Sequence, residues 1–371
     1  MLETARLRRD FIDLTESNPT RVDLPWSDDA EILRALADPA SLRYQPTPEG
    51  LPAARQAVAD YYRRCHRQIV DPDRLLLTAS TSEAYAFAWK LLCDPGDRIL
   101  VPAPSYPLFE SLAGLEGVGV DRYPLHHERG WFVDFELLAA QVTPRTRAVV
   151  VVNPNNPTGS YLKADERERL VSLCAEHRLA LVSDEVFADY AVAPDATRVP
   201  TLIDEARVLT LCLSGLSKVA ALPQLKLGWM HVHGPHSDEA LLRLEHIADS
   251  YLSVSAPVQH ALPSLLRLSD QRRQLLVHRL SQNRATLAAL TADTALTLLP
   301  AEGGWTSILR LPAAHTDALW ARHFLDAGVW VQPGFFYDFA DGAWAVLSLL
   351  SPPAAFRIGV TRLVEATVSR L

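Results

Sequence analysis

The sequence has few cysteines, no excess of positive charge and no long apolar run. Four cysteines occur in 371 residues, and no two stand at a spacing that suggests a zinc site or a disulfide framework. They lie singly in apolar stretches, at Cys65, Cys93, Cys174 and Cys212. We therefore expect buried thiols in a reducing compartment and no metal site.

The charge balance argues against a nucleic-acid partner. Lysine and arginine total 36 and aspartate and glutamate total 44, which gives a formal net charge of −8, and no basic run is interleaved with aromatic residues. Nowhere do eighteen apolar residues run together, and residues 1–10 lack the continuous apolar core of a signal peptide. The expected protein is cytoplasmic, with no nucleic-acid and no membrane partner.

Alternating apolar runs and amphipathic stretches are present from Leu75 to Val232, and they predict an α/β fold with a mainly parallel sheet. Seven runs are expected as strands: Leu75–Ala79, Arg98–Pro102, Val118–Tyr123, Ala148–Val152, Leu179–Ser183, Val208–Leu213 and Leu227–Val232. Three stretches between them are expected as helices: Ser82–Leu92, Pro107–Leu115 and Lys163–His177. The chain is long enough for one large core and a smaller domain.

The pattern changes near Asp270, where a long helix rich in arginine and glutamine is expected to run to Leu290. Strand-like pieces follow at Ala295–Leu299, Ser307–Leu311 and Val329–Gln332. We expect three parts: an arm (residues 1–40) that packs on the small domain, a large domain (residues 41–268), and a connecting helix with a small C-terminal domain (residues 269–371). No internal repeat and no low-complexity tract is found.

Polar residues follow several of the predicted strands. Lys218 ends an apolar segment, and a lysine in such surroundings has a lowered pKa and a free lone pair, so it can form a Schiff base with a carbonyl cofactor. Asp184 could pair with a pyridinium nitrogen, and Asn156 with a phenolic oxygen. Because parallel strands bring their carboxyl ends to one edge, these residues and Ser80 are expected to share a pocket. These are the parts of a pyridoxal phosphate site.

Each motif alone is better explained as a turn or a solvated strand end, but together they are specific. The chain resembles the class I/II aminotransferases of PLP fold type I, the aspartate aminotransferase superfamily, nearly from end to end. The resemblance lies in Tyr44–Gly50, Leu77–Ala84, Pro102–Pro107, Asn153–Gly159, Ser183–Glu185, Ser217–Lys218 with Gly228, and Phe356–Gly359. It implies a large domain with a mainly parallel seven-stranded sheet flanked by helices, plus a smaller α+β domain.

The resemblance implies pyridoxal 5′-phosphate as cofactor and three catalytic residues. Lys218 would form the Schiff base and, once displaced, would move a proton at the substrate Cα. Asp184 would keep the pyridine nitrogen protonated, and Tyr106 would lie against the ring face. Asn156 would donate to the ring oxygen O3′.

The phosphate is expected at the start of a helix, where Ser80 and Thr81 supply backbone N–H groups and hydroxyls. Ser217 and Lys226 would close the other side. In this family the residue that matches Tyr44 reaches the phosphate of the neighbouring subunit. The resemblance therefore implies a homodimer with shared active sites.

Three positions depart from the family pattern. Phe187 stands where a tyrosine usually donates to O3′, which predicts a Schiff base that stays protonated to higher pH than in tyrosine-bearing relatives. Lys226 replaces an arginine and loses the planar fork of donors. Gly215 replaces a frequent serine near the phosphate.

The substrate side of the site is expected to contain Arg357, whose match in the family binds the α-carboxylate through two parallel hydrogen bonds. Arg362 is the competing candidate. Asn18 is expected over the substrate, and the surroundings of the side chain would be aromatic, which favours neutral or hydrophobic amino donors: Trp305, Phe335, Phe336 and Tyr337.

The resulting functional hypothesis is an aminotransferase that exchanges an amino group between an amino acid and a 2-oxo acid by a ping-pong mechanism. A β-lyase, decarboxylase or synthase of the same fold stays open, because the bond that breaks depends on an angle that a sequence does not show. A non-catalytic sensor of this fold is the third alternative. Such sensors usually carry an N-terminal DNA-binding domain, for which the residues before Tyr44 leave no room.

Overall fold

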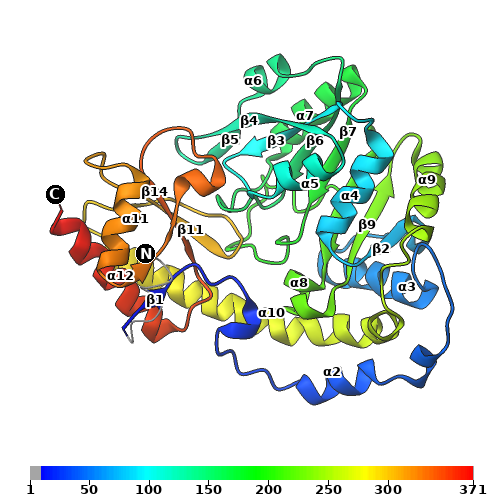
Figure 1. Cartoon of the computed structure of the whole chain (residues 1–371), viewed down its shortest axis with the longest axis horizontal. Helices are drawn as coiled ribbons and strands as arrows, with labels where there is room; N and C mark the ends of the chain where they lie inside the picture. The colour runs from blue at the N-terminus through cyan, green and yellow to red at the C-terminus, as the bar shows by residue number, and fades with distance from the viewer. Residues whose placement is uncertain (1–9, 371) are drawn as a thin grey trace.

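The computed structural model has a large sheet and a small sheet, and the long helix α10 (Ala256–Thr291) runs past both, its first half against the large sheet and its second half against the small one (Figure 1). The structure describes residues 10–370. Helix α10 begins well before the predicted Asp270, because its first half is apolar and packs into the core of the large sheet through Leu262 and Leu265. The arginine-rich pattern marks only its second half.

The large sheet has eight strands where seven were predicted. Their order is β2 (Leu75–Thr78), β9 (Gly228–His233), β8 (Thr210–Gly215), β7 (Ala180–Asp184), β6 (Thr146–Val152), β3 (Arg98–Ala103), β4 (Gly119–His127) and β5 (Trp131–Val133). All seven predicted strands are present. The eighth, β5, returns antiparallel from β4 and is three residues long, too short to show an alternating pattern.

The middle of this sheet is parallel and buried on both faces. Strands β4, β3, β6, β7 and β8 pair parallel, while β9 runs antiparallel to both β8 and β2. Every residue of β7 is buried, as expected for a strand covered on both sides. Along β6, Val149 and Val151 face one apolar core, whereas Ala148, Val150 and Val152 face the other.

Helices cover both faces. The core on one face includes α4 (Thr81–Leu92), α5 (Phe109–Leu115) and α9 (Ser237–Asp249), and the core on the other includes α3 (Pro52–Tyr61), α6 (Phe135–Ala140), α7 (Ala164–His177) and the start of α10. The three helices predicted between strands are thus confirmed as α4, α5 and α7. Strand ends are aligned by the register, in which Val152 pairs with Asp184 and Asp184 pairs with Leu213.

The small sheet has the order β10 (Thr297–Leu298), β11 (Thr306–Arg310), β14 (Trp344–Ser348) and β13 (Gln332–Pro333), and its strands are antiparallel. Helices α11 (Asp317–Asp326) and α12 (Pro353–Val368) complete this α+β part. Near the N-terminus, β1 (Ile12–Asp13) pairs parallel with β12 (Val329–Trp330), and α2 (Asp29–Leu36) contacts α10 (Figure 1). The domain boundaries at residues 40 and 268 stay a prediction.

Short elements connect these parts. They are α8 (Leu216–Val219), the π-helical turn η3 (Tyr62–His66) and the 3-10 turns η1 (Pro19–Arg21), η2 (Pro39–Leu42), η4 (Pro72–Arg74), η5 (Pro223–Leu225) and η6 (Gly334–Tyr337). Helix α8 matters most for the site, because it directly follows β8 and carries Lys218.

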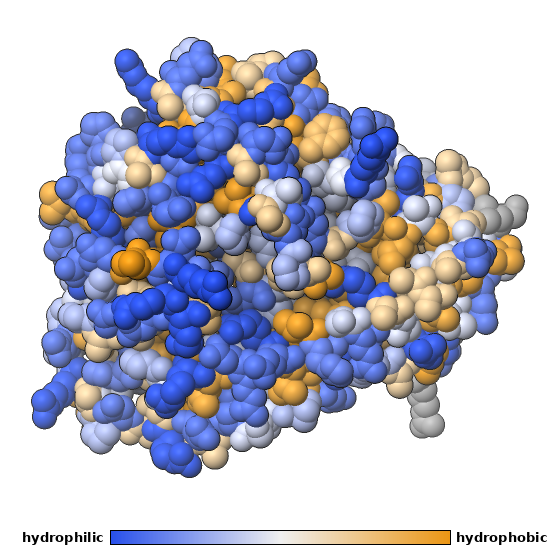
Figure 2. Space-filling view, turned by 180° about the vertical axis from the view of Figure 1, so that it is seen from behind, coloured by the Kyte–Doolittle hydropathy of each residue, from blue (hydrophilic) through white to orange (hydrophobic). Residues whose placement is uncertain are grey.

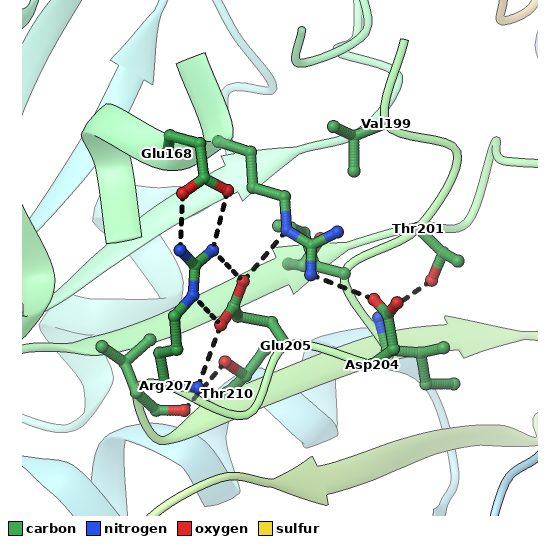
Figure 3. Close-up of polar contacts among 12 residues, drawn as sticks. Glu168, Val199, Thr201, Asp204, Glu205, Arg207 and Thr210 are labelled. Atoms are coloured by element: carbon green, nitrogen blue, oxygen red, sulfur yellow. Dashed lines mark hydrogen bonds and ion pairs between the residues drawn. The ribbon is translucent and has the colours of Figure 1, made fainter. Parts of the chain in front are cut away.

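An ion-pair network secures the segment that leads into β8 (Figure 3). Arg207 donates to Glu205 (Nε to Oε1, 2.9 Å) and to Glu168 (NH1 to Oε2, 2.6 Å), and Arg167 donates to the second oxygen of Glu205 (Nε to Oε2, 2.9 Å). Glu205 is only 1% exposed. Burial opposes its ionisation, but the hydrogen bonds from Arg207 and Arg167 prevail and lower the pKa of Glu205 to about 2.

The surface seen from behind is mostly hydrophilic, with apolar residues gathered in separate patches (Figure 2). Within residues 10–370, no helix has both the length and the apolar character needed to cross a membrane. All four cysteines are free thiols: Cys174 and Cys212 are buried as predicted, whereas Cys65 and Cys93 are only partly buried, each near a helix end.

Candidate active site

A cavity of about 250 Å³ lies where β6, β7 and β8 end and where the small sheet and the N-terminal segment face the large sheet. Its wall brings together ten of the residues that the sequence singled out: Thr81, Tyr106, Asn156, Asp184, Phe187, Gly215, Ser217, Lys218, Trp305 and Tyr337. The rule that parallel strands gather their loops at one edge explains why residues so far apart in the chain meet here.

Lys218 lies in α8 with its amine among aromatic rings. The Nζ atom is 4.7 Å from the ring centroid of Trp305 and 5.5 Å from that of Phe187. Burial lowers the pKa of Lys218 to about 8, although Asp184 acts in the opposite direction. The Tyr190 hydroxyl donates to the backbone oxygen of Lys218 at 2.6 Å and so fixes the turn. An amine in this state loses its proton readily and can act as a nucleophile near neutral pH.

Asp184 is the last residue of β7, and its side chain is buried. Oδ2 accepts a hydrogen bond from the Tyr85 hydroxyl at 2.9 Å, and Oδ1 accepts from the Val186 N–H at 3.1 Å. Burial raises the pKa of Asp184, while these two hydrogen bonds and Lys218 oppose the rise. A carboxylate at this depth would be stabilised by a positively charged group placed in the cavity.

Tyr85 also lines the cavity, and sequence reasoning missed it. Its position could have been found, because Tyr85 stands four residues after Thr81 on the same helix and therefore faces the same side.

The loop after β6 carries Asn156 to the cavity. Its neighbour Asn155 is buried, donates from Nδ2 to the Pro104 carbonyl oxygen at 2.9 Å, and accepts from the Ser105 hydroxyl at 3.0 Å. These bonds tie the loop after β6 to the loop after β3, so that Asn156 and Tyr106 both line the cavity. Burial, and then the charge of Asp184, raises the pKa of Tyr106, so its phenol stays protonated.

The start of α4 offers backbone donors to the cavity. Ser80 caps the helix by accepting the Glu83 N–H at 3.2 Å, and the Glu83 carboxylate accepts the N–H of Ala79, the residue before the cap, at 2.6 Å. Ser80 therefore serves its own helix and does not line the cavity. The Thr81 and Ser82 N–H groups have no acceptor within the helix, and both residues line the cavity.

Gly228 of β9 packs directly against the start of α4. A Cβ atom there would lie 3.0 Å from the Ser80 carbonyl carbon and 3.1 Å from the Thr81 nitrogen, closer than the backbone of α4 would allow without moving. The lack of a side chain lets β9 pack against the start of α4. Together with Ser217, the free N–H groups make a surface that suits an anion.

Besides Ser80, four predicted site residues do not line the cavity within this chain: Lys226, Asn18, Arg357 and Tyr44. Lys226 is exposed on the turn before β9, in the left-handed conformation with φ 50°. Asn18 caps η1 by accepting from the Thr20 N–H at 3.0 Å, and its neighbours Thr15 and Ser17 line the cavity instead. Arg357 is exposed on α12.

The position of Arg357 follows from the packing of α12. Phe356 is buried, and Gly359 packs so closely against Leu14 and Ile12 that a Cβ there would lie 3.0 Å from a Leu14 methyl group. Helical geometry then turns the two residues between them outward. Arg362, the competing candidate, donates to the Asp10 backbone oxygen at 2.6 Å.

Tyr44 lies on a different surface. It is 86% exposed and lines a separate cavity of about 370 Å³, near Leu42, which is 90% exposed. The role that the resemblance implies for Tyr44 involves a second subunit, so it stays a prediction.

The small sheet supplies residues that the sequence did not single out. Thr306 of β11, Gln332 of β13 and Ser348 of β14 line the cavity, and Tyr337 of η6 donates from its hydroxyl to Gln332 Oε1. Of the aromatic residues proposed from the sequence, Trp305 and Tyr337 reach the cavity wall, whereas Phe335 and Phe336 are exposed and do not.

Comparison with known proteins gives one family. The model of the family described as aminotransferase class I and II matches residues 9–371. The glutamate-pyruvate aminotransferase AlaA of Escherichia coli (strain K12) is 31% identical over 220 residues, which are 59% of this chain and 54% of that protein. The alanine aminotransferase of Mycobacterium tuberculosis is 31% identical over 235 residues, 62% of this chain and 54% of that protein. The match thus spans about half the length of these curated relatives.

Solved structures resemble the chain over nearly its whole length. The aspartate aminotransferase from Thermus thermophilus with maleate is 26% identical, with a TM-score of 0.85, and the match covers 98% of this chain and 94% of that one. The tyrosine aminotransferase from Leishmania infantum, at 23% identity and a TM-score of 0.86, has the same fold, with 97% and 92% covered.

Proposed function

The chain belongs to the aminotransferase class I and II family, and from this premise we propose that it is a pyridoxal-phosphate-dependent aminotransferase. The reaction is the exchange of an amino group between an amino acid and a 2-oxo acid, in two half-reactions that share one pocket. One observation carries the proposal: a lysine with a lowered pKa and a buried aspartate line the same cavity as the free N–H groups of a helix start. The names of the relatives, which are aminotransferases, support the reaction type.

The residues present fit the cofactor at each of its polar parts. Thr81, Ser82 and Ser217 would hold the phosphate through backbone N–H groups and hydroxyls. Asp184 would hold a proton on the ring nitrogen, for which its buried carboxylate is suited. Asn156 would donate to the phenolic oxygen, and Tyr106 would cover the ring face.

Pyridoxal phosphate, when bound, supplies a ring that accepts electrons from the substrate Cα. Lys218 contributes the rest of the chemistry. Its amine would hold the cofactor through a Schiff base. After release, the amine would take a proton from the substrate Cα atom and deliver one to the cofactor atom C4′. The pKa of about 8 leaves part of the amine unprotonated near neutral pH, which a base requires.

Spectroscopy of the cofactor-loaded protein tests the reaction type. Mixing with an amino donor and no oxo acid should convert the bound cofactor stoichiometrically to the pyridoxamine form, with one equivalent of 2-oxo acid released. Addition of a second 2-oxo acid should restore the first spectrum. Continuous release of pyruvate and ammonia without an oxo acid would instead identify a lyase and contradict the proposal.

We propose in addition that the protein is a homodimer in which Tyr44 of each subunit completes the phosphate site of the other. The exposure of Tyr44 and Leu42 beside a cavity supports such a contact, because large apolar side chains are rarely left so open without a partner. Sedimentation analysis tests the assembly, and Tyr44→Phe should weaken cofactor binding. The four free thiols support a reducing, cytoplasmic compartment.

A further inference from the structure

The wall of the cavity that comes from the small sheet is polar but uncharged. It contains Thr306 from β11, Gln332 from β13, Tyr337 from η6 and Ser348 from β14. Ser348 already donates its hydroxyl hydrogen to the backbone oxygen of Glu16 at 2.6 Å, which ties β14 to the N-terminal segment. Gln332 is therefore the side chain on this wall with the most hydrogen-bonding capacity to offer a ligand.

A hydrogen bond from Tyr337 sets the orientation of the Gln332 amide. The Tyr337 hydroxyl donates to Oε1 of Gln332, and burial raises the pKa of Tyr337, so the phenol keeps its proton. With Oε1 engaged as an acceptor, the Nε2 group stands as a neutral donor of two hydrogens. Gln332 is placed by the pairing of β13 with β14, in which it lies opposite the buried Val346, so its backbone is fixed as well.

The charged groups of the cavity stand elsewhere on its wall. Among the described residues that line it, Lys218 and Asp184 carry charge, and both belong to the large-sheet side. Arg357 and Lys226 are exposed outside it. A carboxylate facing Gln332 would thus meet neutral donors, whereas charge-assisted bonds from a guanidinium would be roughly twice as strong. The free-energy cost of removing a carboxamide from water is much smaller than that of removing a carboxylate.

We propose that Gln332 is a specificity-determining residue that binds the polar group on the substrate Cα through neutral hydrogen bonds, so that the site accepts α-amino compounds in which this group is uncharged. The substrate class is widened to amino acid amides and 2-amino alcohols. This inference rests on the proposed aminotransferase function and deepens it.

The test compares two probes that differ only in charge, L-alanine and L-alaninamide. Single-turnover conversion of the cofactor-loaded protein should give L-alaninamide a kcat/KM equal to or above that of L-alanine. Binding supplies a readout that needs no turnover: propionamide should bind at least as tightly as propionate in calorimetry, since these compounds keep the skeleton and lack the amine.

Variants then assign the effect to one side chain. Gln332→Leu should raise KM for L-alaninamide at least tenfold with little change in kcat, because it removes binding and leaves Lys218 in place. Gln332→Arg should raise the ratio of kcat/KM for L-alanine over L-alaninamide at least tenfold. Tyr337→Phe, which frees the amide to rotate, should raise KM less than Gln332→Leu does. Gln282→Leu, on the exposed face of α10, is the matched control and should change nothing.

Two results separate failure of this inference from failure of the proposed function. If L-alanine exceeds L-alaninamide by more than 100-fold and Gln332→Leu leaves that ratio unchanged, Gln332 does not set specificity, and the protein is still an aminotransferase. If no amino donor converts the bound cofactor, the proposed function itself fails. If, in that case, propionate also binds more tightly than propionamide, the present inference is overturned too.

Discussion

Two buried carboxylates in this protein, Glu205 and Asp184, have pKa values shifted in opposite directions. Glu205 is 1% exposed and Asp184 is 8% exposed, yet the pKa of Glu205 is lowered to about 2 and that of Asp184 is raised. Glu205 accepts hydrogen bonds from two arginines, which satisfy its charge within the chain (Figure 3). Within residues 10–370, the Asp184 carboxylate accepts hydrogen bonds from one phenol and one backbone N–H only, and the positive charge that acts on it is that of the more distant Lys218.

The difference teaches which buried charge serves stability and which serves chemistry. A charge fully paired inside the chain has no capacity left for a ligand, whereas an incompletely compensated one in a cavity can pair with a cation that arrives with a ligand. Substitutions in the ion-pair network around Glu205 are thus expected to change folding stability and leave activity unchanged. Substitutions of Lys218 and Asp184, the charged pair of the cavity, are expected to change activity with little effect on folding.

The largest effect on activity is expected when the Lys218 amine is removed. Lys218→Ala should lower the rate of the amino-donor half-reaction by about 1000-fold or more, because both the nucleophile and the proton carrier are lost. Lys218→Arg should be as inactive, since a guanidinium keeps its proton. The apparent rate of cofactor conversion measures this, and Lys90→Ala, at the Glu116 ion pair, is the matched control that should stay active. Activity of either Lys218 variant within tenfold of wild type would contradict the assignment.

Asp184→Asn tests the other half of the cavity pair. The amide preserves the shape and can still accept the bond from Tyr85, but it removes the charge that would hold a proton on the ring nitrogen. The half-reaction rate should fall by about 100-fold or more, on the scale of a lost electrostatic interaction in a dry site. The free energy of unfolding of the cofactor-free protein should change little or rise. A marked loss of stability with retained rate would place Asp184 beside Glu205 as a structural residue.

Glu205→Gln should produce the reverse pattern. The amide removes the charge and turns an NH2 group towards Arg207 or Arg167, which keep their bonds to Glu168 and Asp204, so the free energy of unfolding should drop by about 2 kcal/mol. Denaturant titration of the cofactor-free protein measures the drop. The rate per folded molecule should equal that of wild type, and a lower rate would mean that the network supports the site.

The same network predicts a pH dependence of stability. The folded-state pKa of Glu205 lies below its ordinary value of 4.5, so its stabilising effect is complete above that value and is lost as the pH falls towards about 2. The stability difference between wild type and Glu205→Gln should therefore shrink over this range. A difference that stays constant down to pH 2 would show that folding does not lower the pKa of Glu205.

The smallest expected effect concerns Phe187 on the cavity side. Phe187→Tyr adds a hydroxyl that can donate to the phenolic oxygen of the cofactor, which should lower the pKa of the Schiff base by about one unit. A spectrophotometric pH titration of the loaded protein measures it. An unchanged or raised pKa would refute the role given to this departure from the family pattern.

The sequence predicted the parts of the structure that depend on local pattern. Continuous apolar runs identified the parallel strands, and the common edge of such a sheet brought Asn156, Asp184 and Lys218 together. It did not predict the outward position of Arg357, although the spacing of Phe356, Gly359 and Val360 marks the buried face of a helix that excludes it.

Gln332 was beyond sequence reasoning for a physical reason. It lies in a strand of two residues whose partner, β14, follows a dozen residues later, so neither length nor alternation marks it. Its importance comes from the Tyr337 bond and from the cavity wall, both of which exist only in the folded chain.

The most direct test of the central claim is chemical trapping of the lysine. The cofactor-loaded protein is reduced with borohydride, digested, and mapped by mass spectrometry. We predict one modified peptide, with the pyridoxyl group on Lys218. A label on another lysine, or no label on a protein saturated with pyridoxal phosphate, would contradict the claim.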